Sequence, residues 1–109
     1  MKNYALKWLT QRITASILIP LTFWFIYSAI SLSKMAYYEI EIFFQSYLNA
    51  FLFFVMMQSM LLHSKLGIQT IIEDYVTSKK TAKFIKISIN YLIYLFMILI
   101  TINILRMVL

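Results

Sequence analysis

The residues best suited to chemistry begin with His63, the only histidine in the chain. It lies near the end of a long apolar segment, where an ionisable side chain is treated first as a functional candidate. An imidazole here is suited to three roles: ligating haem iron, transferring protons, or hydrogen-bonding a neighbouring helix. Gly67, four positions later, lies on the same helical face and leaves room for a flat macrocycle or for another helix backbone.

Asp74 and Tyr75 form a second group of chemically capable side chains. Asp74 follows His63 by eleven positions, which on an α-helix returns to within about 20° of the same face, roughly 16 Å along the axis. An acid and a phenol at a membrane surface, beyond a buried histidine, suit a site where a quinone headgroup takes up protons and accepts a hydrogen bond. The plainer interpretation is a solvated acidic cap beside an interface tyrosine.

Arg12 stands where the first apolar segment begins, on the same side of the membrane as Asp74. Its guanidinium is suited to pairing with haem propionates or with the anionic form of a redox ligand. The alternative is a positive residue whose charged end extends to the lipid headgroups. Arg12 alone does not decide between them.

Three long uncharged segments must position these side chains. There are 21 residues between Arg12 and Lys34, 23 between Glu41 and Lys65, and 19 between Lys86 and Arg106. Each is close to the ~20 residues that a helix needs to cross a hydrocarbon core of ~30 Å. The sequence therefore predicts an all-α membrane protein, one domain over residues 1–109, with three transmembrane helices at about 13–33, 42–64 and 87–105.

Composition supports this class and excludes others. The hydrophobic content of 62% exceeds the roughly 45–50% of soluble domains. So short a chain cannot bury that surface within itself, so we expect its helices to pack with partner chains and with membrane lipid. Charges lie at the segment ends and form no basic stripe, which argues against nucleic acid as a partner. Without cysteine the chain has no thiolate ligand for an Fe–S cluster and no cysteine nucleophile.

Basic residues predict the orientation. One side would hold the N-terminus and the connection between the second and third segments, whereas the other has only Lys34 and Arg106. Because basic residues collect on the cytoplasmic or matrix side, that side is predicted to carry the N-terminus. The basic residues on it are Lys2, Lys7, Arg12, Lys65, Lys79, Lys80, Lys83 and Lys86.

Two motifs resemble those of a known family. His63, Gly67, Asp74 and Tyr75 stand at the spacing His-x-x-x-Gly-(six residues)-Asp-Tyr of the small hydrophobic membrane-anchor, or cytochrome b, subunit of succinate dehydrogenase, respiratory complex II. The stretch 11–15 resembles that family's Arg-x-Thr entry to its first helix. Three spans, chain length and orientation agree as well.

The resemblance implies roles for four residues. His63 would be one axial ligand, and so a metal-binding residue, of a haem b shared with the partner subunit, which would supply the second ligand. Tyr75 would hydrogen-bond a ubiquinone carbonyl, Asp74 would assist proton delivery, and Arg12 would lie near the haem propionates or the quinone.

The same resemblance implies partners and a location. They are the large cytochrome b anchor subunit, an Fe–S subunit and a flavoprotein carrying FAD, so this chain would be a non-catalytic subunit of a quinone-reducing enzyme. The membrane would be the mitochondrial inner membrane or the bacterial cytoplasmic membrane.

One departure and two rival functions remain. Glu73 adds a second acid before Asp74, and the sequence does not decide which of them faces the quinone.

An alternative function is that of a structural accessory subunit of another respiratory complex without haem, in which His63 only hydrogen-bonds a neighbouring helix. A third possibility is a small proton-conducting membrane protein with His63 and Asp74 as relay groups.

Overall fold

The structure, a computed structural model, describes residues 3–109 and consists of four helices in that range. They are α1 (Tyr4–Leu32), α2 (Tyr37–Gln45), α3 (Tyr47–Tyr75) and α4 (Lys79–Val108). Helices α1, α3 and α4 are each long and apolar enough to cross a membrane. The predicted all-α membrane fold with three long apolar helices is therefore confirmed.

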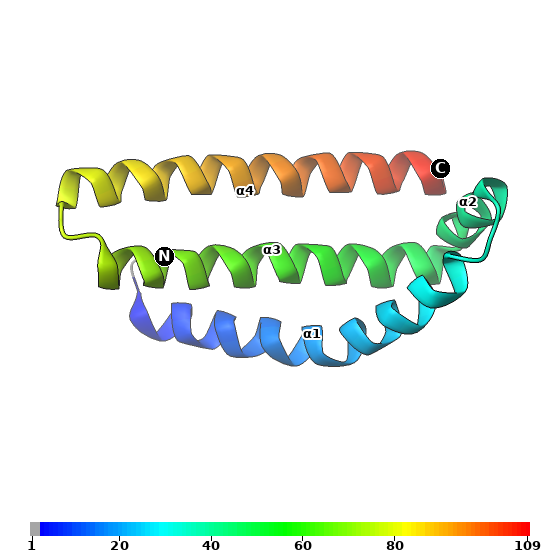
Figure 1. The fold of residues 1–109 in the computed structure, drawn as a ribbon, viewed down its shortest axis with the longest axis horizontal. Coiled ribbons are helices and arrows are strands. Elements are labelled where there is room, and N and C mark those ends of the chain that lie inside the picture. The colour runs from blue at the N-terminus through cyan, green and yellow to red at the C-terminus, as the bar shows by residue number, and fades with distance from the viewer. Residues whose placement is uncertain (1–2) are drawn as a thin grey trace.

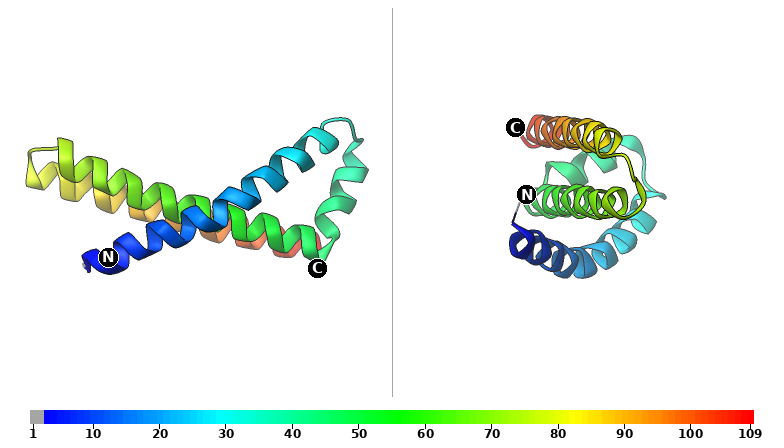
Figure 2. Two further views of the ribbon diagram at one scale, coloured as in Figure 1. Left: turned by 90° about the horizontal axis from the view of Figure 1, so that it is seen from below. Right: turned by 90° about the vertical axis from the view of Figure 1, so that its left-hand side faces the viewer.

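Helix α3 lies in the middle of the molecule, with α1 on one side and α4 on the other (Figure 1). Helices α3 and α4 run antiparallel along their whole length, whereas α1 crosses them at an angle (Figure 2). The N-terminal end of α1 and the α3–α4 connection lie at one end of the bundle, and α2 and the C-terminus lie at the other. Lys2, counted among the basic residues above, lies outside the described residues.

Side-chain caps define where two of the long helices begin. The Asn3 side chain accepts hydrogen bonds from the backbone N–H groups of Ala5 and Leu6, at 2.9 and 3.4 Å. Ser78 does the same for Thr81 at 3.3 Å, at the start of α4. Such caps satisfy N–H groups that have no partner within the helix. Pro20 lies inside α1, which is visibly curved (Figure 1), as a helix with a missing N–H donor is expected to be.

The expected second span of about 42–64 does not coincide with one helix. Its first residues belong to α2, and the chain turns at Ser46, whose backbone is extended (φ −67°, ψ 126°). The turn is stable because the Asn49 side chain donates to the backbone oxygen of Phe43 at 3.1 Å, and the Phe43 ring stacks on Trp24 of α1. Helix α3 then continues to Tyr75, beyond the predicted end.

The interior of the molecule is small and belongs mostly to α3. Leu66 is the one large side chain buried completely among the described residues, and Ala50, Met56 and Ile72 of the same helix are also buried. Most large apolar side chains on α1 and α4 are exposed. This outward apolar surface suits lipid or other membrane chains, and water would not stabilise it.

Candidate functional site

An open cavity of about 470 Å³ lies between the N-terminal half of α1 and the C-terminal half of α3. It brings together three of the four predicted site residues, His63, Asp74 and Arg12. Tyr75 does not line it. The remaining lining residues are Tyr4, Lys7, Trp8, Gln11 and Ala15 of α1 and Thr70 and Glu73 of α3.

His63 is oriented by a hydrogen bond from the neighbouring helix. Its Nδ1 atom lies 3.0 Å from the hydroxyl oxygen of Thr14, a buried residue of α1. The Thr14 hydroxyl donates its one hydrogen within α1, to the carbonyl oxygens of Thr10 and Gln11 at 2.8 and 3.1 Å. Its oxygen is thus left to accept, so this arrangement favours a hydrogen on Nδ1 and a free lone pair on Nε2. Metal-ligating histidines are commonly held in this way by a second hydrogen bond.

Gln11 contributes an unsatisfied polar atom close to the histidine. Its Oε1 atom is buried and has no hydrogen-bond partner among residues 3–109. A Cβ placed on Gly67 would lie 3.9 Å from the Gln11 Nε2 atom, which is an ordinary contact. Within this chain, therefore, no close helix contact requires the glycine. The open space and the unpaired acceptor both remain on the side of α3 that faces α1.

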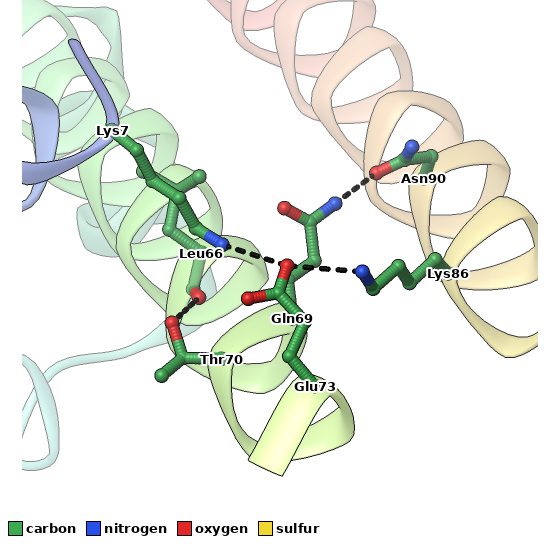
Figure 3. A network of polar contacts seen from close by, with 7 residues as sticks. All are labelled: Lys7, Leu66, Gln69, Thr70, Glu73, Lys86 and Asn90. Carbon is green, nitrogen blue, oxygen red and sulfur yellow. Dashed lines mark hydrogen bonds and ion pairs between the residues drawn. The ribbon is translucent and has the colours of Figure 1, made fainter. Parts of the chain in front are cut away.

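The structure separates the roles of the two neighbouring acids. Both line the cavity, but Glu73 Oε1 accepts from Lys86 Nζ at 2.9 Å and from Lys7 Nζ at 3.3 Å (Figure 3). Glu73 thereby links α3 to α4 and to α1. Asp74 is exposed and forms no ion pair or hydrogen bond from its side chain to any described residue. Of the two, Asp74 is the acid whose carboxylate is free to act on a ligand.

Arg12 is also free to bind an anion. It is exposed, and its guanidinium carbon lies 5.5 Å from the centre of the Trp8 ring. No carboxylate of the described chain pairs with it. A ring below and open space above suit a guanidinium that binds a carboxylate or phosphate.

Tyr4 and Tyr75 differ in their position relative to the cavity. Tyr75, at the end of α3, is 80% exposed and lies outside the cavity lining. Tyr4, to which the sequence motifs assign no role, lines the cavity. The signal that could have identified Tyr4 is its spacing, because Tyr4, Trp8 and Arg12 recur every four residues and so share one face of α1.

Three membrane-crossing helices with a polar, histidine-containing cavity near one end define a multi-pass membrane protein with a candidate ligand site between its helices. Among the described residues, no group of three or more His, Asp or Glu side chains could hold a metal ion by itself. Any metal bound at His63 therefore needs further ligands from outside this part of the chain.

Residues 3–104 match the model of the succinate dehydrogenase/fumarate reductase transmembrane subunit family, and the chain belongs to this family. The resemblance seen in the two sequence motifs is thereby confirmed. No curated protein and no solved structure gives a significant match. Membership implies association with other succinate dehydrogenase or fumarate reductase subunits, in agreement with the exposed apolar surface.

Proposed function

We propose that the chain is the membrane-anchor subunit of a succinate:ubiquinone oxidoreductase, in which it donates one axial ligand to haem b and forms part of the quinone site. The observation that carries this proposal is the contact between His63 Nδ1 and the Thr14 hydroxyl. It supports an imidazole whose Nε2 lone pair is directed away from its own hydrogen bond and is available to iron.

The surroundings of His63 fit a haem with propionate groups. Gly67 leaves room on the histidine face, and Arg12, without a carboxylate partner in the described chain, is suited to pair with a propionate. The unsatisfied Gln11 Oε1 needs a hydrogen-bond donor, which an ionised propionate does not supply. Since His63 is the only histidine, the second axial ligand would come from the large cytochrome b subunit. Bound there, haem would supply a centre for one-electron transfer.

The same end of the bundle supports a quinone site. Asp74 would deliver a proton to the reduced quinone, because its carboxyl group is accessible and is not paired with a lysine. Tyr75 would donate to a quinone carbonyl from outside the cavity seen in this chain, in a pocket completed by a partner subunit. Tyr4 is the phenol that already lines the cavity.

In the whole complex the chemistry of succinate would take place elsewhere. Electrons would leave succinate at FAD in the flavoprotein, pass through the Fe–S subunit, and reach ubiquinone beside this chain. The end carrying Lys7, Glu73 and the α3–α4 connection would face the matrix or the cytoplasm, in a mitochondrial inner or bacterial cytoplasmic membrane.

The test is the reduced-minus-oxidised absorbance spectrum of the detergent-solubilised assembly. We expect a b-type haem band and a co-purifying flavoprotein for the wild type, and loss or displacement of the band in His63→Ala. Ser64→Ala is the matched control, since Ser64 is exposed and does not line the cavity. A wild-type complex with flavoprotein but no haem would contradict the ligand role. An assembly with neither would favour a structural accessory subunit of another complex.

A further inference from the structure

The contact between α3 and α4 is a regular series of polar pairs, unlike the mainly apolar surfaces around it. Four rungs cross the interface: Gln58 Nε2 to Thr101 Oγ1 at 3.2 Å, Lys65 Nζ to Tyr94 Oη at 2.7 Å, Gln69 Nε2 to Asn90 Oδ1 at 2.8 Å, and Lys86 Nζ to Glu73 Oε1 at 2.9 Å. Two of them are drawn in Figure 3, where both reach from α3 toward α4.

The rungs follow a single antiparallel register. The steps of seven, four and four residues along α3, from 58 to 65, 69 and 73, are matched by equal steps back along α4, from 101 to 94, 90 and 86. Lys65 is 5% exposed and Gln69 is 7% exposed, so the α3 side chains of the two central rungs are buried, whereas Tyr94 is 48% exposed. A buried ammonium without its partner would be costly, and Lys65 has no carboxylate partner among the described residues.

The face that carries the rungs lies away from the face that carries the site. At ~100° per residue, the rung positions of α3 and the positions of His63, Gly67, Thr70 and Asp74 are centred roughly 135° apart around the helix. Rotation of α3 by one residue would therefore turn His63 away from Thr14. In lipid, apolar side chains do not favour one rotation over another, because contact with lipid tails and contact with another helix are equally apolar.

We propose that these four rungs set the rotation and register of α3 against α4, and so act as positioning residues that present His63 and Asp74 to the cavity. Sliding α4 by one turn in one direction places Lys65 opposite Ile98, and in the other places Glu73 opposite Ala82. Only the observed register partners all four polar side chains of α3. The proposal concerns helix assembly and does not depend on haem.

Cysteine cross-linking tests the register directly, because the natural chain has no cysteine. Leu62 and Met97 occupy the one position of the series without a polar rung, and Ile93 lies one turn from Met97. In membranes holding the assembled complex, we compare oxidative linkage of Leu62→Cys with Met97→Cys against Leu62→Cys with Ile93→Cys, by mass spectrometry of linked peptides. We expect the first pair to link at least five-fold more.

The same comparison is then made after rungs are removed. Gln69→Leu with Asn90→Leu should reduce the preference to about two-fold or less, whereas the exchange Gln69→Asn with Asn90→Gln should largely restore it. Asn103→Leu is the matched control, since Asn103 of α4 bonds only its own helix at Leu99. An unchanged preference in the leucine variant overturns the proposal. So does a preference for the 62/93 pair in the natural background. If the natural complex held no haem but showed the expected preference and its loss in the leucine variant, the proposed ligand role would be contradicted and this proposal would stand.

Discussion

At the scale of single residues, Thr14 determines which ring nitrogen of His63 is free of a hydrogen bond. Its hydroxyl is buried and donates its hydrogen within α1. The hydroxyl oxygen therefore accepts from Nδ1–H of His63, and the Nε2 atom of His63 stays free. Asp74 and Glu73, adjacent in the chain, differ in the same local way, because only Glu73 has lysine partners.

We predict that Thr14→Val weakens haem binding by about ten-fold or more, the range seen when partners of metal ligands are removed. Valine has nearly the same shape but offers no acceptor, so Nδ1–H would be left buried without a bond. Haem content per flavin and the low-temperature EPR spectrum of the oxidised complex are the measurements. Thr14→Ser should retain both. A valine variant with natural haem content and spectrum would contradict the role given to Thr14.

We predict that Asp74→Asn lowers the rate of ubiquinone reduction by at least about ten-fold, in keeping with the contribution of a general acid. Reduction of a soluble acceptor that bypasses quinone should stay unchanged, because under the proposed function succinate would be oxidised in other subunits. Glu73→Gln serves as the comparison and should slow quinone reduction less, since Glu73 is occupied by Lys7 and Lys86. Equal losses in both variants would contradict the separation of roles.

At the scale of elements, α1 and α4 are attached to α3 by different means. The α3–α4 pair has four polar rungs, whereas the side-chain bonds from α1 to α3 include Thr14 to His63 and Lys7 to Glu73. The cavity lies on the side of α3 that faces α1.

We predict that Lys7→Met speeds hydrogen exchange in the first two turns of α1 by about two-fold, because an exposed or partly exposed ion pair contributes only ~0.2–1 kcal/mol. Exchange followed by mass spectrometry in detergent-solubilised complex would measure it. Lys80→Met is the control, since Lys80 is exposed and has no partner in the described structure. Equal exchange in Lys7→Met and wild type would show that the ion pair does not hold α1.

Much of this arrangement could be predicted from the sequence. Uncharged segments identified three helices because lipid requires long apolar stretches, and helical spacing placed His63 and Asp74 on one face. The turn at Ser46 was not predicted, since it depends on Asn49 and Phe43 meeting after the chain reverses. Thr14 and Tyr4 were given no role, because their contacts arise only where α1 crosses α3.

At the scale of the whole molecule, most of the large apolar side chains of the chain face outward. Its buried apolar residues are few, and large side chains cover the outer faces of α1 and α4. In its family such a chain belongs to an assembly of several subunits, and the outer faces are the surface that those subunits and lipid can cover.

We predict that the chain made without its companion subunits inserts into the membrane but is degraded several-fold faster than in the complex. Exposed polar groups in the cavity and uncovered apolar faces would leave it open to proteases of the membrane. Pulse-chase labelling with and without the large anchor subunit would measure the half-life. Equal half-lives would show that the chain is stable by itself.

The rung between Lys65 and Tyr94 has a consequence for biosynthesis. The two residues are 29 positions apart, so the ribosome completes Lys65 well before its partner exists. A lysine at the centre of an inserting helix costs about 2.5–3.5 kcal/mol on translocon scales, and Lys65, beyond the midpoint of α3 (Tyr47–Tyr75), costs a part of this. Helix α3 is therefore expected to remain beside the translocon until α4 has been synthesised. The two helices are then expected to enter the lipid together as a hairpin.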